Sequence, residues 1–228
     1  QILGQRHKDI KNQMTAPPRL TIKNIINMAT KPHWCLGMLQ TKRHGFSNII
    51  GHATGVENLT SLSDWSAKTL MRTLNWDDLS WIMKRWGGKV ILKGIQDVED
   101  AKMAVKTGAD AIVVSNHGGR QLDGALSSIR SLPSIIEAVG NQIEVWMDGG
   151  IRSGQDVAKA VSLGAKGVMI GRPYIYGLGA MGQKGVSKAL EVIHKELDTT
   201  MALCGERNIT NMTRENLLIP KGFSGNWE

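Results

Sequence analysis

The sequence predicts an α/β protein made of consecutive strand–helix units, and a (β/α)8 barrel is the favoured architecture. Three observations support this fold class. Short β-branched runs alternate with amphipathic stretches from residue 89 onward, one strand–helix–strand unit occurs twice, and each expected strand ends in polar residues. Alternation alone fits a doubly wound sheet as well as a barrel, because both join parallel strands by right-handed crossovers. The polar strand ends favour the barrel, whose site is assembled from consecutive strands.

The elements of this half follow from their apolar patterns. Four apolar runs predict strands, and the stretches with helical periodicity between and after them predict helices. The expected strands cover residues 89–94, 111–116, 143–149 and 167–172. The expected helices cover residues 97–107, 126–139, 153–163 and 184–204. This order predicts parallel pairing of neighbouring strands.

An internal repeat links two of these units. The stretch GIQDVEDAKMAVKTGADAIVVS (94–115) aligns with GIRSGQDVAKAVSLGAKGVMIG (150–171). The matching pairs are Gly94 and Gly150, Asp100 and Asp156, Ala104 and Ala160, Val105 and Val161, Gly108 and Gly164, and Ala109 and Ala165. The glycine that ends each helix is expected to adopt positive φ and to reverse the chain into the next strand.

Residues 1–88 have a different character, rich in Asn, Thr, His, Trp and Met, and predict loops with short helices. Pro17 and Pro18 exclude a helix across TAPPRLTIKNI. The stretch WDDLSWIMKRWGG predicts a short helix ended by Gly87 and Gly88. The chain is therefore expected to divide near residue 88, with four βα units following at 89–228.

Composition places the 228-residue chain among ordinary soluble globular proteins, with 41% hydrophobic and 21% charged residues. A net charge of +8 permits an anionic partner, but no nucleic-acid-binding motif frames the basic residues. Cys35 and Cys204 form no CxxC pair and no metal-ligand spacing, so free buried thiols in a reducing compartment and no metal are expected. Without a signal peptide or a membrane-spanning run, a cytoplasmic protein is expected, peripheral to a membrane at most. The first residue, Gln1, suggests a fragment or a processed piece.

The four strand ends carry residues suited to one shared site. They are Lys93; Ser115 with Asn116 and His117; Asp148 with Gly149 and Gly150; and Gly171 with Arg172. The loops DGGIRSGQD and IGRP add glycines, a helix N-terminus and two guanidiniums, a combination typical of a phosphate site. The alternative is that these glycines serve only tight turns and that the arginines are solvated.

His117 is the candidate general base, with Arg120 three residues later as a carboxylate clamp. A lone histidine at a strand end can also be a structural hydrogen-bonding group. Lys93 suits either a Schiff-base lysine, as in aldolases and isomerases with phosphate-binding barrels, or a cation beside a cofactor.

The motifs VVSNHGGRQLDG, DGGIRSGQDVAKA and GRPYIYG closely resemble the FMN-dependent L-2-hydroxy acid oxidases and dehydrogenases, which include glycolate oxidase, L-lactate dehydrogenases and mandelate dehydrogenase. The segments LGQRHKDIKN and PPRLTIKN extend the resemblance over essentially the whole chain. The motifs PHW and SNHGGRQLDG are most similar to those of the L-lactate dehydrogenase branch. The resemblance implies the last four βα units of a TIM barrel, preceded by a long insertion, and FMN as cofactor.

The resemblance also implies roles for individual residues. His117 matches the base that takes a proton from the substrate while two electrons pass to the flavin, as hydride or through a carbanion. Arg120 and Arg6 match the arginines that hold the substrate carboxylate, and Lys93 matches the lysine beside flavin N1 and O2. The remaining flavin contacts match Ser115, Asp148, Gly149, Gly150, Ile151, Arg152, Gly171 and Arg172.

The chain departs from the family by lacking its N-terminal half, with four strands and further flavin contacts. We therefore expect weak or no FMN binding by this chain alone, and a partner chain or a truncated product as the explanation. A non-catalytic remnant is the alternative to an enzyme. Residues 27–75 match a variable insertion suited to peripheral membrane contact or to a mobile loop. The resemblance further implies a quinone, a cytochrome or oxygen as electron acceptor, and a homo-oligomer when complete.

Overall fold

A computed structural model describes residues 6–13, 20–41, 48–49, 52–56, 59–69 and 73–223. The chain forms two compact units, Gln1–Leu74 and Asn75–Glu228, and each is described by itself.

The described part of the first unit consists of short helices and connecting segments, as predicted. The helices are α1 (His7–Lys11), α2 (Ile22–Ala29), α3 (Pro32–Gln40) and α4 (Leu59–Thr69). Thr21 caps α2, because its hydroxyl oxygen accepts a hydrogen bond from the backbone N–H of Asn24 at 3.2 Å. Helix α3 begins with a proline and packs against α2. Pro17 and Pro18 lie outside the described residues.

The predicted helix before the sheet is α5 (Trp76–Trp86). Asn75 and Asp78 form a capping box at its start, and Gly87 ends it in the left-handed conformation with φ 67°. The expected division of the chain near residue 88 is displaced, because α5 belongs to the second unit. The physical reason is Trp76, which packs against the core of that unit.

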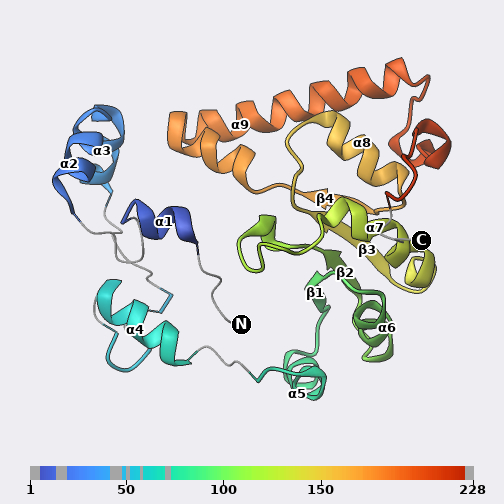
Figure 1. Cartoon of the computed structure of the whole chain (residues 1–228), viewed down its shortest axis with the longest axis horizontal. Coiled ribbons are helices and arrows are strands. Elements are labelled where there is room, and N and C mark those ends of the chain that lie inside the picture. Colours follow the sequence, from blue (N-terminus) through green and yellow to red (C-terminus); the bar gives the residue numbers. More distant parts are fainter. Residues whose placement is uncertain are drawn as a thin grey trace. The chain divides into compact units, whose positions relative to one another are not determined.

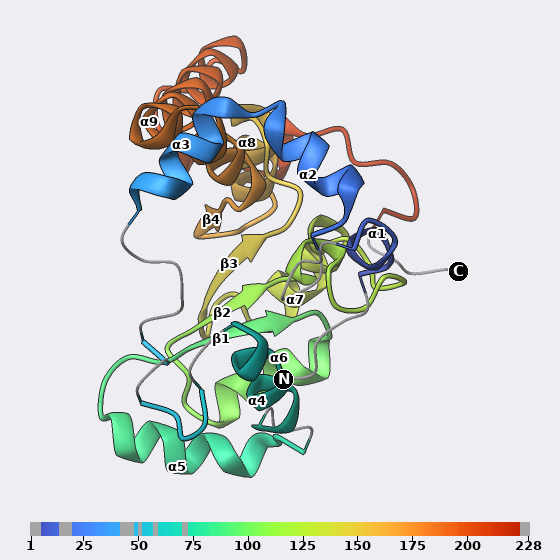
Figure 2. The same ribbon diagram turned by 90° about the vertical axis from the view of Figure 1, so that its left-hand side faces the viewer.

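The second unit is built on a four-stranded parallel sheet in the order β1-β2-β3-β4. The strands are β1 (Ile91–Ile95), β2 (Ala111–Val114), β3 (Glu144–Asp148) and β4 (Gly167–Met169), and Figure 2 shows them side by side in chain order. A doubly wound sheet reverses its strand order at a switch point, whereas a barrel adds each strand beside the previous one. The order among the described strands therefore matches a barrel segment.

Helices follow each strand and bury one face of the sheet. They are α6 (Val98–Lys106), α7 (Ser128–Val139), α8 (Gly154–Ser162) and α9 (Arg172–Leu203), with short 3-10 turns at His117–Gly119, Ile209–Asn211 and Arg214–Asn216. Helix α6 packs on β1 and α7, α7 packs on β2 and β3, and α8 lies between β4 and α9 (Figure 1). The core between helices and sheet contains Ile112, Val114, Leu132, Ile135 and Met147, all of them buried.

The internal repeat predicted from the sequence is present as two identical turns. In the first copy the N–H of Ala109 donates to the carbonyl of Ala104 at 3.2 Å, and in the second copy Ala165 donates to Ala160 at 3.1 Å. The intervening glycines, Gly108 and Gly164, have φ of 81° and 103°. This is the Schellman geometry, in which a glycine ends the helix and turns the chain back into a strand.

Helix α9 has two helical segments, of which the second matches the helix predicted over residues 184–204 and the first was not predicted. The helix begins at Arg172 and contains a break at Met181 and Gly182, where φ is −143° and 60°. Gly177 and Gly185 lie so close across this break that a Cβ on either would overlap the backbone of the other. Glycine has a low helix propensity, so the glycines of this segment argue against a helix in the sequence. Packing between the two parts of α9 stabilises the helix despite this low propensity.

Candidate functional site

One cavity of about 600 Å³ lies at the carboxyl ends of the strands of the second unit. Its walls contain ten of the residues predicted for the site: Lys93, His117, Arg120, Asp148, Gly149, Gly150, Ile151, Arg152, Gly171 and Arg172. His117 and Arg172, from the β2 and β4 ends, therefore open onto the same space. The convergence expected from the polar strand ends is what the geometry shows.

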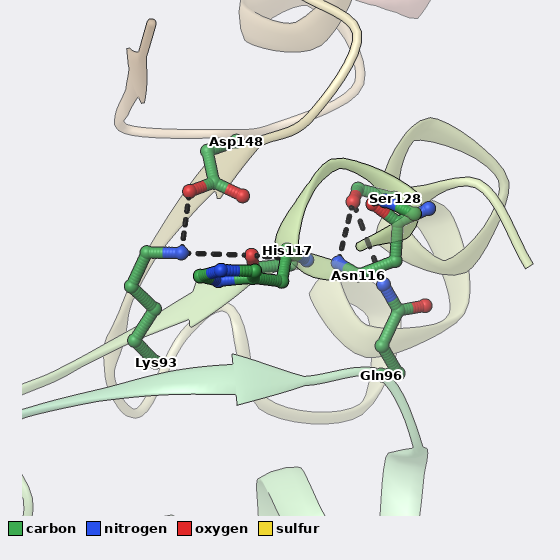
Figure 3. Close-up of polar contacts among 8 residues, drawn as sticks. Lys93, Gln96, Asn116, His117, Ser128 and Asp148 are labelled. Carbon is green, nitrogen blue, oxygen red and sulfur yellow. Dashed lines mark hydrogen bonds and ion pairs between the residues drawn. The ribbon is translucent and has the colours of Figure 1, made fainter. Parts of the chain in front are cut away.

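Lys93 joins three strand ends through polar contacts. Its Nζ lies 2.6 Å from Oδ2 of Asp148 and donates a hydrogen bond of 2.9 Å to Oγ of Ser115 (Figure 3). Ser115 is buried, and although it does not line the cavity, it connects Lys93 to the segment that carries His117. A positive charge is thus fixed at the lining of the cavity, where it can stabilise negative charge on a bound group.

The turn after β2 presents His117 in a left-handed conformation with φ 55°. Its backbone N–H donates to Oγ of Ser115 at 3.1 Å, and its side chain is exposed. From the far side, Nη2 of Arg172 donates to the carbonyl of Gly118 at 2.8 Å. Non-glycine residues at positive φ are uncommon and cluster at functional sites. The backbone conformation of His117 therefore makes this turn a candidate functional site.

The part of the cavity at the start of α9 has the features of an anion site. Gly150 and Gly171 face open space, because a Cβ at either position would meet no atom within 4 Å. Helix α9 begins at this point without a side-chain cap, and Arg152 and Arg172 lie on the same wall. Exposed backbone, an uncapped helix N-terminus and two guanidiniums together suit a phosphate.

The N-terminus of α8, in contrast, is not available to a ligand in the way the sequence indicated. Oδ2 of Asp156 accepts hydrogen bonds from the backbone N–H groups of Arg152 at 2.9 Å and Ser153 at 3.0 Å. Oε2 of Glu196, from α9, accepts from Gly154 at 3.0 Å. These carboxylates satisfy the amides that were expected to point at a phosphate, which shifts the anion site toward the start of α9.

Asp148 supplies a test of which ligand the cavity fits. Its Oδ2 is paired with Lys93, but its Oδ1 is buried and has no hydrogen-bond partner in the structure. A buried acceptor without a donor carries a desolvation cost of about 1–3 kcal/mol, which a ligand hydroxyl would relieve. The cavity thus fits a group with hydroxyls near Asp148 and a phosphate near Arg172, as in the ribityl phosphate of FMN.

Arg6, the other predicted carboxylate-binding residue, lies in the first unit just before α1. The geometry of the second unit therefore does not test its role. Among the described residues, no group of three or more His, Cys, Asp or Glu side chains could hold a metal ion. Cys35 and Cys204 are free thiols, as expected, but the expected burial is wrong, because Cys35 is half-buried and Cys204 is exposed.

Sequence reasoning missed the residues that hold the turn after β2 from behind. Asn116 donates its backbone N–H to Oγ of Ser128 at 3.1 Å, and Gln96 donates to the same oxygen at 3.4 Å. Ser128 stands at the start of an unremarkable helical pattern, and its partners are 12 and 32 residues away in the sequence. No local signal could have identified it.

Comparison with known proteins decides the family. The model of the FMN-dependent dehydrogenase family matches residues 1–219. The chain belongs to this family. L-lactate dehydrogenases of Caulobacter sp. (strain K31) and Azorhizobium caulinodans are 43% and 44% identical to it, each over 94% of the chain. These matches cover 56% and 57% of the relatives, so the chain spans little more than half the length of the FMN-dependent dehydrogenases it resembles.

Solved structures of the family give the fold of the complete enzymes. A monotopic membrane protein, (S)-mandelate dehydrogenase, matches 95% of the chain and 57% of its own length with a TM-score of 0.88 at 31% identity. A mandelate oxidase variant bearing an FMN adduct matches 62% of the chain at 47% identity with a TM-score of 0.60. The four parallel strands of this chain are therefore part of a (β/α)8 barrel, and FMN is the cofactor of the family.

Proposed function

We propose that this chain is the C-terminal half of an FMN-dependent enzyme that oxidises an L-2-hydroxy acid, L-lactate first, to the 2-oxo acid. One observation carries the proposal: a candidate base, a carboxylate-binding arginine and an anion site line a single cavity of about 600 Å³. L-lactate dehydrogenases that are 41–44% identical to the chain support lactate as the substrate.

Each part of the cavity has a proposed ligand. Arg152, Gly171 and Arg172 hold the phosphate of FMN, and Asp148 accepts a hydrogen bond from the ribityl chain. Lys93, supported by its hydrogen bond to Ser115, would contact the flavin ring, and Gly149, Gly150 and Ile151 would contact the rest of the cofactor. When bound, FMN supplies a two-electron acceptor, which no side chain can provide.

The substrate is held by its carboxylate and loses a proton to an imidazole. Arg120 is the proposed carboxylate-binding residue of the second unit, and the family resemblance gives Arg6 the same role. The neutral ring of His117 accepts a proton from the substrate while two electrons leave the carbon that bears the hydroxyl group. Lys93 forms an ion pair with Asp148, which supports the role of a cation beside the cofactor over that of a Schiff-base lysine.

The proposed activity requires the missing strands. In the described residues the sheet ends at β1 on one side and β4 on the other, and each has one paired neighbour. The match to little more than half of each relative points to a complementary half with the remaining strands. The competing proposal is a non-catalytic remnant that folds without binding flavin.

Flavin absorbance and its bleaching separate these proposals. The chain is purified alone and after co-expression with the part of the Caulobacter L-lactate dehydrogenase that it does not match. We expect a yellow complex only in the second case, and loss of the colour when L-lactate is added without oxygen. A complex that holds flavin but is not bleached by any short L-2-hydroxy acid contradicts the proposed activity. A chain that never binds flavin supports the remnant.

We further propose that α2 and α3 contact a membrane surface. Both helices expose large apolar side chains, with Ile22 79% and Leu39 81% exposed and Ile26 and Leu36 also exposed. Lys23 and Lys31 lie among them in the sequence, as expected for an anionic lipid surface. No helix in the described ranges is long and apolar enough to span a bilayer. The monotopic (S)-mandelate dehydrogenase supports peripheral attachment as the family's route.

Sedimentation with lipid vesicles tests this attachment. Leu39→Asp is expected to weaken binding to vesicles containing phosphatidylglycerol by about tenfold or more, because it removes a fully insertable side chain and adds a like charge. Leu203→Asp is the matched control, since Leu203 is 84% exposed but lies at the end of α9. Equal loss in both variants contradicts a surface formed by α2 and α3.

A further inference from the structure

The turn that carries the proposed base is strained and needs support from outside. His117, Gly118 and Gly119 have φ of 55°, 65° and 70°, three left-handed residues in succession. For a residue with a Cβ this conformation costs roughly 1–2 kcal/mol, so the turn persists only where surrounding contacts determine it. Ser115 supplies one contact, because its hydroxyl oxygen accepts a hydrogen bond from the backbone N–H of His117. The preceding residue, Asn116, is held by a different group.

That group is the hydroxyl of Ser128, at the first residue of α7. Ser128 is buried, with 2% of its surface exposed, and its Oγ accepts the backbone N–H of Asn116 at 3.1 Å. Nε2 of Gln96, just after β1, donates to the same oxygen at 3.4 Å. Figure 3 shows Gln96 and Asn116 both directed at Ser128, behind the imidazole of His117.

The orientation of Gln96 is itself fixed. Its Oε1 accepts a hydrogen bond of 2.7 Å from the hydroxyl of Ser131, which is 3% exposed. The carbonyl side of the amide therefore faces Ser131, and the amino side faces Ser128. A chain of partly buried hydrogen bonds links Ser131, Gln96 and Ser128 to the backbone of Asn116.

Ser128 also lies close to Gly149, which lines the cavity. A Cβ added to Gly149 would lie 3.0 Å from Oγ of Ser128 and 3.0 Å from Oδ1 of Asn116, so the turn after β3 packs closely on both atoms. The hydroxyl thus stands where the ends of β1, β2 and β3 meet, and loss of it would loosen the turn of His117 against the turn of Asp148.

We propose that Ser128, oriented by Gln96, is a positioning residue that fixes the backbone of Asn116 and thereby the place of His117 in the cavity. The catalytic consequence rests on the proposed role of His117 as the base. The anchoring itself concerns the backbone, and can be measured whether or not the enzyme oxidises lactate.

The test compares Ser128→Ala with Ser128→Thr, which keeps a hydroxyl, and with Ser162→Ala. Ser162 is an apt control because it is buried, 3% exposed, and its hydroxyl has no hydrogen-bond partner in the structure. Hydrogen exchange of the segment 115–120 is measured on the flavin complex and on the chain alone. We expect exchange about tenfold faster in Ser128→Ala, near normal exchange in Ser128→Thr and no change in Ser162→Ala.

Kinetics provide the second readout. In the lactate-oxidising complex, Ser128→Ala is expected to lower kcat by tenfold to about a hundredfold, because a small displacement of a catalytic group is costly, while the affinity for FMN changes less. Gln96→Leu, which leaves the serine in place, should give a smaller effect of the same kind. It replaces Ser128→Ala in the comparison if that variant does not fold.

The outcomes distinguish the two proposals. Unchanged exchange of the 115–120 segment in both Ser128→Ala and Gln96→Leu overturns the anchoring. Faster exchange in Ser128→Ala that Ser128→Thr does not restore also overturns it, because a general loosening and not the lost hydroxyl is then responsible. Faster exchange that threonine restores, in a complex that fails to oxidise any L-2-hydroxy acid, supports the anchoring and rejects the proposed activity.

Discussion

Nζ of Lys93 and Oδ2 of Asp148 lie 2.6 Å apart, although their strands, β1 and β3, are separated by β2. The same ammonium donates to Ser115 on the intervening strand end. One lysine thus ties together three consecutive strands at the mouth of the cavity. The side chain of Asp148 is 17% exposed, so this carboxylate depends on Lys93 far more than a surface carboxylate would.

Lys93→Met is expected to weaken both the fold and the binding of flavin. It leaves a mostly buried carboxylate without its cation, at a cost of roughly 1–3 kcal/mol. Lys102→Met is the matched control, because Lys102 forms an ion pair of similar length with Glu99 on the surface of α6, where the loss should be below about 1 kcal/mol. Urea unfolding of both variants checks the difference, and equal effects would contradict it.

Arg172→Met is expected to lower the affinity for FMN by about tenfold or more, because it removes a guanidinium from the anion site. It also removes the hydrogen bond to the carbonyl of Gly118, so the turn of His117 should become more mobile. Arg207→Met, at an exposed position outside the cavity lining, is the control. Fluorescence titration with FMN measures the change in affinity. The affinity for riboflavin, which lacks the phosphate, should be almost the same in Arg172→Met as in the unchanged protein.

Gly154→Ala is expected to destabilise the second unit by roughly 1–3 kcal/mol, because the new Cβ would overlap the backbone of Leu197 in α9. Gly179→Ala is the matched change within α9, where a Cβ meets nothing within 4 Å. There the substitution should stabilise by up to about 1 kcal/mol, since alanine favours a helix. Thermal unfolding with the two variants shifted in opposite directions confirms the close packing of α8 on α9.

The pair of Lys89 and Asp110 gives a prediction in pH. A hydrogen bond from Lys89 Nζ at 2.6 Å, with another from the backbone N–H of Val90 at 2.8 Å, holds the pKa of Asp110 below its ordinary 3.8. The hydrogen bond with Asp110 likewise raises the pKa of Lys89 above its ordinary 10.5. Since the folded carboxyl has the lower pKa, its stabilisation is present above pH 3.8 and is lost as the pH falls through the folded value.

Asp110→Asn should therefore unfold more readily than the unchanged chain near neutral pH, and equally readily in strong acid. Asn keeps an acceptor for Val90 but removes the charge. The difference should also fade above pH 10.5, as Lys89 loses its proton. Urea midpoints across the pH range measure it, and a difference that persists in strong acid would show that the ion pair is not its cause.

The order of strands and helices was predictable because each has a strong local signal. The runs AIVV and EVWMD are strands as expected, the first fully buried and the second buried at Val145 and Met147. The turns at Gly108 and Gly164 follow from a glycine at the end of a helical pattern. The first part of α9 was not predictable, because its helix depends on the contact of Gly177 with Gly185, which a propensity argument cannot see.

The site divides in the same way. Residues at strand ends were identified from their positions in the chain, and most of them line the cavity, with Ser115 as an exception. The blocked N-terminus of α8 was half visible, because Ser153 followed by Asp156 three residues later is the pattern of a capping box. Glu196, which closes it, comes from 42 residues beyond Gly154, and only the packed structure brings the two together.

The matching turns at Gly108 and Gly164 precede the amino ends of β2 and β4. The cavity lies at the carboxyl ends of the strands, so the turns are at the opposite end of the sheet. Substitutions at the amino ends of the strands can thus change the thermal stability without changing the residues that line the cavity. Stabilising substitutions next to these two turns are therefore expected to leave the cavity unchanged.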